Sequence, residues 1–168
     1  MSREERRLTV SWEDPGALGR SARDMPGLDF IRAIQVGELP PAPIQQLLGF
    51  PLVEVQEGRV VFAAEPGEQH YNPIGVVHAG LVATLLDSSM GAAVHTTLDA
   101  GTAYTTLETK FNLVRAVTAE SGEIRSEGEV VHRGSRVATA QGRVARVSDG
   151  KLVAHGTSTC LILPLDDG

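Results

Sequence analysis

The chain opens with a polar segment, which is followed by short apolar stretches with the spacing of helices. Residues 1–27 are charged and rich in Pro and Gly, so we expect a loose arm, which Trp12 could pin to a neighbouring surface. A short helix is expected at residues 28–36. Three prolines then introduce a second helix at 44–48, and Gly49 would close it.

Most of the remaining chain alternates between apolar and polar residues, which is the pattern of half-buried strands. Strands are expected at 51–56, 59–64, 104–115, 122–132, 136–147 and 152–163. Glu57-Gly58 and Ser148-Asp149-Gly150 separate two pairs of them and indicate hairpin turns. In the strand at 104–115, strict alternation places Leu107, Phe111 and Leu113 on one face.

One long segment, about residues 79–95, breaks this alternation and predicts a helix that is apolar almost all round and therefore mostly buried. Gly80, Thr84, Asp87 and Gly91 fall on one side of it, where a ligand or another backbone could approach closely. About six strands with one segregated long helix predict the α+β class.

The chain divides into two parts on this pattern. Residues 1–44 form an N-terminal arm with short helices, and residues 45–168 form the main domain. The role of the first part stays open, since it could cap a pocket or contribute to an oligomer.

Composition excludes several classes of protein. A hydrophobic fraction of 42% supports a core without a disulfide or structural metal, and the net charge of −6 suits nucleic acid poorly. Cys160 is the only cysteine, which excludes an intrachain disulfide and a cysteine-cluster metal site. Since neither an apolar run long enough to span a membrane nor a secretory signal is visible, we expect a cytoplasmic protein without a membrane partner.

The segment before and within the long helix carries the candidate chemistry. A turn containing Asn72 leads to His78, and the helix start that follows presents the backbone N–H groups of Ala79 and Gly80 at the positive end of the helix dipole. Asp87 is a lone carboxylate on this apolar helix, which is unfavourable unless it has a partner or a task. Together these residues indicate an oxyanion site near a base or nucleophile.

The segments at 70–87, 105–113 and 132–140 resemble the hotdog-fold acyl-CoA thioesterases of the phenylacetate-degradation (PaaI-like) type, over about residues 45–163. The most specific match is Asn72, Gly75 and His78 with a carboxylate nine residues after the histidine. This resemblance implies a long helix wrapped by an antiparallel sheet and active sites between protomers. It also implies homodimers joined sheet edge to sheet edge, usually paired into tetramers, and an acyl-CoA substrate with no further cofactor.

The resemblance also implies a role for each matched residue. Asp87 would activate water as general base or attack the thioester directly, and both routes stay open. Ala79 stands where the family usually has glycine, and its N–H would face the thioester oxygen. The hydroxyl residue that helps to orient water is matched best by Thr106. His78 could orient the loop or bond the acyl carbonyl, and Asn72 could hold the water or the carbonyl.

Arg133 and Arg136 flank a predicted turn and could bind the phosphates of coenzyme A. Each candidate also has a structural explanation: a hydrogen-bonded Asp or His, an ordinary Asn-Pro turn, a strand threonine, or exposed turn arginines. The sequence contains no metal-binding histidine motif, and a metal site is not expected.

Two other functions stay open. The first is hydration or dehydration of enoyl thioesters on the same fold. His78 and Asp87 are poorly placed to cooperate in such a reaction within one protomer, because about two and a half helical turns separate them. The second is a module that binds acyl-CoA without turnover.

Overall fold

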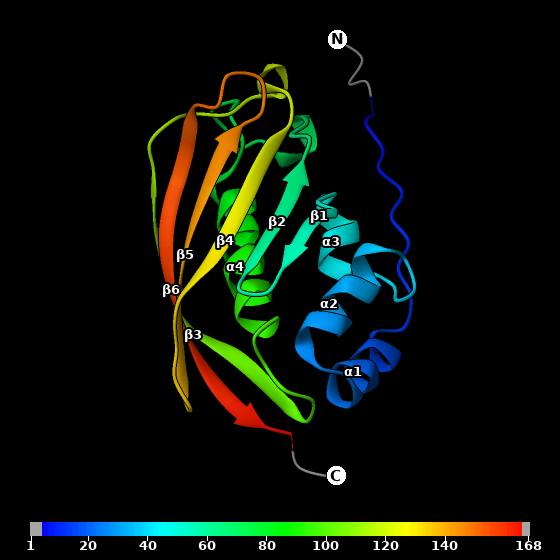
Figure 1. Ribbon diagram of the computed structural model, residues 1–168. Coiled ribbons are helices and arrows are strands. Elements are labelled where there is room, and N and C mark those ends of the chain that lie inside the picture. Colours follow the sequence, from blue (N-terminus) through cyan, green and yellow to red (C-terminus); the bar gives the residue numbers. More distant parts are fainter. Residues whose placement is uncertain (1–4, 166–168) are drawn as a thin grey trace.

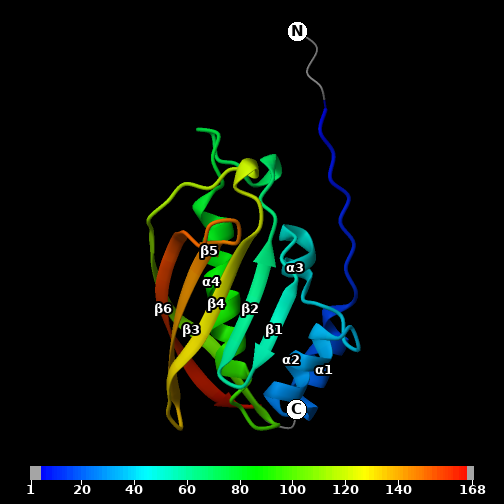
Figure 2. The same cartoon turned by 45° about the horizontal axis from the view of Figure 1, so that its top comes forward.

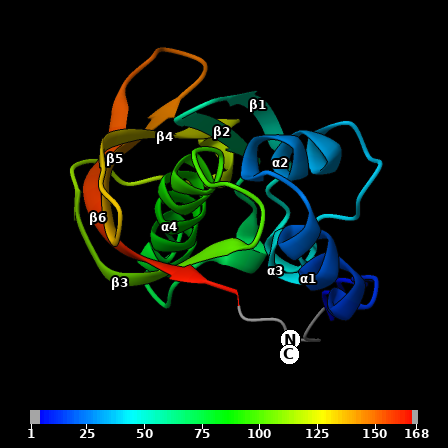
Figure 3. The same ribbon diagram turned by 60° about the horizontal axis from the view of Figure 1, so that its bottom comes forward.

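The computed structural model describes residues 5–165, in which one long helix lies against a six-stranded antiparallel sheet (Figure 1). The helix is α4 (Ala79–His95). The strands are β1 (Leu52–Gln56), β2 (Arg59–Ala64), β3 (Thr102–Leu113), β4 (Ile124–Arg133), β5 (Val137–Arg146) and β6 (Leu152–Pro164). Their order is β1-β2-β4-β5-β6-β3, so the strand that follows α4 in sequence lies at the far edge. Figure 3 shows the sheet curving around α4, which confirms the predicted α+β hotdog fold.

The N-terminal part contains more regular structure than predicted. The prediction of a loose arm over residues 1–27 is wrong for α1 (Pro15–Asp24), which begins where the Asp14 side chain accepts a hydrogen bond from Gly16 N (2.9 Å). Residues 1–4 of that arm lie outside the described residues. Trp12 is 61% exposed, so this protomer does not pin it.

Two further helices connect the N-terminal part to the core. They are α2 (Gly27–Gln35) and α3 (Pro43–Leu48), close to their predicted ranges. Phe30 and Ile31 of α2 are buried in the same hydrophobic cluster as α4. The short helices therefore cover the side of α4 that the sheet leaves open (Figure 3).

A row of glycines lets α4 sit close to the middle of the sheet. Gly128, Gly142 and Gly156 are directly paired across β4, β5 and β6. A Cβ atom on Gly128 would lie 2.3 Å from the backbone carbonyl of Ser89, and one on Gly142 would lie 2.9 Å from Met90 Cγ. Gly128 and Gly142 therefore set the distance between helix and sheet, whereas a Cβ atom on Gly156 would meet Lys110 O of β3 at 2.6 Å.

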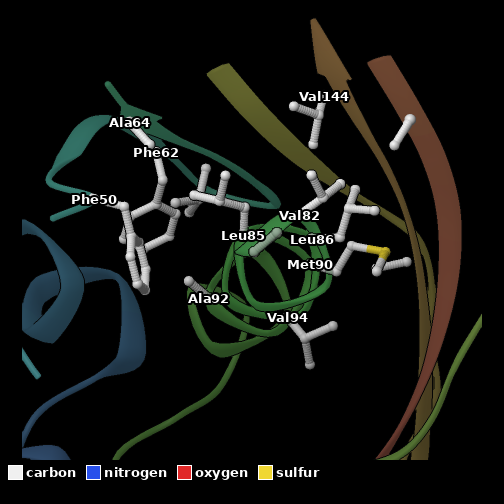
Figure 4. Packing of buried hydrophobic residues seen from close by; sticks show 14 of the residues in the cluster. Phe50, Phe62, Ala64, Val82, Leu85, Leu86, Met90, Ala92, Val94 and Val144 are labelled. Atoms are coloured by element: carbon white, nitrogen blue, oxygen red, sulfur yellow. The ribbon is translucent and has the colours of Figure 1, made fainter. Parts of the chain in front are cut away.

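Aliphatic side chains fill the space on either side of the glycine row. Leu86 and Met90 are fully buried and point from α4 toward the strands (Figure 4). The buried Ser89 hydroxyl is paired with Ser126 Oγ at 2.8 Å, and Ser126 also donates to Leu85 O. None of the helices in residues 5–165 combines the length and apolar character needed to cross a membrane.

A β-bulge interrupts β3 at Leu107. The pairing of β3 with β6 shifts between Thr106 and Glu108, so Leu107 has no partner of its own and is 59% exposed. Phe111, by contrast, packs against the core. The prediction that Leu107 and Phe111 share one face is therefore wrong, because the extra residue reverses the alternation from this point onward.

Candidate active site

The loop before α4 is held together by its own side chains. Asn72 Oδ1 accepts hydrogen bonds from Ile74 N (3.1 Å) and Val76 N (3.3 Å). Gly75 adopts φ of +83°, a conformation that few other residues tolerate. The spacing of Asn72 and Gly75 is thus explained by the turn itself, in which the side-chain oxygen of Asn72 is already used.

His78 caps the start of α4. Its ring Nδ1 accepts a hydrogen bond from Gly80 N (2.8 Å), and its backbone N–H donates to His70 O (2.7 Å). The Gly80 N–H is therefore occupied within this protomer, contrary to the expectation that it is available to a ligand. The Ala79 N–H has no hydrogen-bond partner among residues 5–165. Of the two N–H groups predicted to bind an oxyanion, it is the one that remains available.

Asp87 lies in the middle of α4 and is exposed. Its Oδ1 accepts a hydrogen bond from Thr109 Oγ1 on β3 at 3.2 Å. Thr106, the residue matched to the hydroxyl that helps to orient water, is paired with Cys160 of β6. The sequence predicted a carboxylate on a mostly buried helix, but the Asp87 side chain is exposed in the single protomer. Its carboxylate is therefore open to a ligand or to a second protein chain.

The face of α4 around Asp87 accommodates close contacts, as the small residues predicted. A Cβ atom on Gly91 would lie only 2.4 Å from the Tyr104 hydroxyl oxygen. Burial raises the pKa of Tyr104, with smaller contributions from the charges of Cys160 and Asp87. Burial also raises the pKa of Cys160, despite the opposing hydrogen bonds from Ser158 and Thr106. Both groups are neutral near pH 7, so neither adds a charge beside Asp87.

An apolar cavity of about 400 Å³ lies next to the start of α4. Ala79 and Val82 line it from the helix, Val153 lines it from β6, and the chain at 113–117 closes its edge. Asn72 is also part of its wall. Asp87 is not, and it lies eight residues beyond Ala79, about 12 Å along the helix axis. One protomer therefore does not bring its own carboxylate to its own helix start.

The two arginines proposed to bind phosphate lie elsewhere. Arg133 and Arg136 are exposed at the tip of the β4–β5 hairpin, where Arg133 Nη1 donates to Gly134 O (3.1 Å). Figures 1 and 2 show this tip at the opposite end of the molecule from the start of α4. Within residues 5–165, no three His, Cys, Asp or Glu side chains lie close enough together to hold a metal ion.

Thr109 is the site residue that sequence reasoning missed. Alternation assigned it to the face opposite Thr106, and only the bulge at Leu107 brings it back to the side of α4. A bulge leaves no reliable signature in a single sequence, although β-bulges are frequent beside active sites.

Comparison with known proteins agrees with this architecture. Residues 74–153 match the thioesterase superfamily. Acyl-coenzyme A thioesterase 13 of Homo sapiens is 30% identical over 109 residues, which cover 64% of this chain and 76% of the human protein. A phenylacetic acid degradation-related protein of Ralstonia eutropha is 28% identical, with a TM-score of 0.70 over 78% of this chain and 98% of that one.

A third relative has been solved with a ligand. A Streptococcus mutans protein bound to acetyl CoA is 24% identical and superimposes with a TM-score of 0.62 over 68% of this chain and 89% of its own. At this identity the likeness supports the fold alone. The human and Ralstonia relatives carry the family assignment, because their identity is higher and the match spans most of each protein. The chain therefore belongs to the thioesterase superfamily and is a thioester hydrolase.

Proposed function

We propose that the protein hydrolyses acyl-CoA thioesters to a free acid and coenzyme A. The observation that carries this proposal is the Ala79 N–H, which has no partner among residues 5–165 and opens beside an apolar cavity at the positive end of α4. A donor in this position suits a thioester oxygen, and the cavity suits an apolar part of the substrate. The names of the relatives, among them an acyl-CoA thioesterase and a protein bound to acetyl CoA, support the choice of coenzyme A.

The active site would be shared between two protomers. The distance of about 12 Å between Ala79 and Asp87 along α4 is too long for both to act on one thioester carbon. A second protomer can supply the missing carboxylate, because Asp87 is exposed and accessible from outside. A homodimer is therefore part of the proposal, with a dimer of dimers as the larger assembly that the resemblance implies.

Strand β3 is the edge on which this dimer would form. It is the last strand of the sheet, and it exposes Leu107 and Leu113, followed by the exposed Val114. An edge strand with unpaired backbone groups is prone to pair with another chain. Antiparallel pairing of β3 with its copy about a twofold axis would bring opposite ends of the two protomers together. The partner's Asp87 and its hairpin with Arg133 and Arg136 would then approach the start of α4.

The proposed reaction follows from these positions. The Ala79 N–H polarises the thioester carbonyl and stabilises the negative charge that develops on its oxygen. The partner's Asp87 removes a proton from water as the water oxygen attacks the carbonyl carbon. The C–S bond then breaks, and the coenzyme A thiolate leaves and takes up a proton. Direct attack by the Asp87 carboxylate, followed by hydrolysis of a mixed anhydride, uses the same residues.

His78, Asn72 and Thr106 would orient the reactants. Because His78 Nδ1 accepts a hydrogen bond from Gly80, the neutral ring carries its proton on Nε2, which can donate to the acyl carbonyl. The side-chain nitrogen of Asn72 is left for the same oxygen or the water, since its Oδ1 is used in the turn. Thr106 would help to hold the attacking water, and Arg133 and Arg136 would bind the phosphates of coenzyme A.

A thiol-release assay tests this function. Short, medium, long and aryl acyl-CoAs are incubated with the protein, and free thiol is measured with a thiol-reactive dye while the acid is quantified. We expect equal amounts of acid and free coenzyme A. Hydration of enoyl-CoA without thiol release would instead support the hydratase, and a thermal shift with acyl-CoA but no turnover would support the binding module.

A further inference from the structure

Thr109 is the residue that contacts the carboxylate proposed to carry out the chemistry. Its Oγ1 lies 3.2 Å from Asp87 Oδ1, across the gap between β3 and α4. Among residues 5–165, Asp87 makes no other hydrogen bond or ion pair, and its side chain is exposed. Thr109 is therefore the one contact within the protomer that can fix the orientation of this carboxylate.

The neighbouring hydroxyl decides where the Thr109 proton goes. Ser158 Oγ on β6 lies 3.5 Å from Thr109 Oγ1 and donates its own proton to Glu108 O at 3.0 Å. Because that proton is committed, Ser158 can act toward Thr109 only as an acceptor. The carboxylate is both closer and the stronger acceptor, so the Thr109 proton is directed to Asp87.

The backbone of β3 is built to present this residue. Without the bulge at Leu107, alternation from the inward-facing Thr106 would place Glu108 and Lys110 toward α4, that is, a second carboxylate or a cation beside Asp87. The bulge shifts the pattern by one residue, so that Thr109 takes this place. A small neutral donor then faces Asp87, and no charge competes with the substrate.

We propose that Thr109 is a positioning residue that holds Asp87 Oδ1, so that Oδ2 points out of the protomer toward the thioester or the attacking water. The terminal torsion of an aspartate side chain is broad, and an exposed carboxylate without such a bond would sample many orientations. Hydrogen bonds to charged groups are strong enough to select one of them. This inference rests on the proposed function, because it assigns Thr109 a role only if Asp87 does the chemistry.

The test compares Thr109→Val, which has nearly the same shape but no donor, with Thr109→Ser, which keeps the donor. We expect Thr109→Val to lower kcat for acyl-CoA hydrolysis about tenfold with little change in KM, and Thr109→Ser to retain most of the activity. Thr157→Val is the matched control, because Thr157 is exposed on the opposite face of the sheet. Thr109→Ala provides the same loss of donor if the valine variant does not fold.

Combination with Asp87→Asn separates positioning from a general structural effect. If Thr109 acts through the carboxylate, Thr109→Val should cause no further loss of activity in the Asp87→Asn background. The inference would be overturned by equal activity of the valine, serine and wild-type proteins, or by equal losses in both backgrounds. Because the proposed function fails only if wild-type protein releases no thiol or Asp87→Asn is fully active, the two failures are distinguishable.

Discussion

Asp87→Asn is expected to lower kcat for acyl-CoA hydrolysis by roughly 10²–10⁴-fold, the usual contribution of a general base. The amide keeps the shape of the carboxylate and can still accept the Thr109 hydrogen bond, but it neither takes a proton from water nor forms an anhydride. Initial rates of thiol release over a range of substrate concentrations measure the effect. KM should change little, because the carboxylate is proposed to act on the reacting carbon and not in binding.

A matched variant separates this effect from a loss of charge alone. Asp99→Asn removes an exposed carboxylate just beyond the end of α4, away from the proposed chemistry, and should leave the rate unchanged. The melting temperature of Asp87→Asn should stay close to that of the wild type, because Asp87 is exposed in the protomer. Full activity of the Asp87→Asn variant would remove Asp87 from the mechanism.

Gly128→Ala is expected to cause the largest loss of stability, about 3 kcal/mol or more in the free energy of unfolding. The new Cβ would lie 2.3 Å from the carbonyl carbon and oxygen of Ser89. These are backbone atoms of α4, so the whole helix must move away from the sheet. For a domain of this size, such a loss lowers the melting temperature by roughly 6–12 °C.

Gly19→Ala is the control for this variant, because it is the same substitution with no atom within 4 Å of the new Cβ. It lies inside α1, where alanine is favoured over glycine by about 0.5–1 kcal/mol, so the protein should become slightly more stable. Urea denaturation of both variants measures the difference. Equal stability of Gly128→Ala and the wild type would show that the glycine row does not set the helix–sheet distance.

The periodicity of the sequence was sufficient to predict the main helix and the strands of the fold. Alternation located all six strands, and the mostly apolar segment at 79–95 located α4, because both patterns follow directly from which side faces the core. The glycine row was also visible in principle, since residues 128, 142 and 156 recur at equal spacing. The spacing alone does not show that these glycines lie side by side. That depends on the register of the strands, which pairs Gly128 with Gly142 and Gly142 with Gly156.

The elements that were missed depend on local geometry. In α1, Asp14 and Pro15 are good starting residues for a helix, but Gly16 and Gly19 weaken the pattern that follows. The bulge at Leu107 depends on how β3 pairs with β6 and not on the residue type. For the same reason, the sequence did not place Thr109 beside Asp87, which it contacts in the structure.

In the candidate site, too, the sequence predicted the local features and missed those that depend on three-dimensional contacts. The sequence located the helix start and the carboxylate, because a cap, an apolar helix and an isolated Asp are all local features. It also placed the carboxylate more than two helical turns from the helix start, but it did not indicate that His78 occupies the Gly80 N–H. These facts leave Ala79 as the remaining donor and point to a second protomer for the carboxylate.

Complementation between two inactive variants tests most directly whether the site is shared. Ala79→Pro removes the backbone donor at a helix start that tolerates proline, and His78 before it already has an extended backbone, φ −63° and ψ 137°. Asp87→Asn removes the carboxylate. Each variant alone should be nearly inactive, since losing one such donor typically costs about 10²–10³ in kcat.

The two variants are unfolded together, refolded as a mixture at equal concentrations, and assayed for thiol release. If Ala79 and Asp87 act from different protomers, half of the dimers are mixed and each has one intact site, so about a quarter of the wild-type activity should return. If both residues act within one protomer, no dimer has an intact site. Activity of the mixture no higher than the mean of the two separate variants would contradict a site shared between protomers.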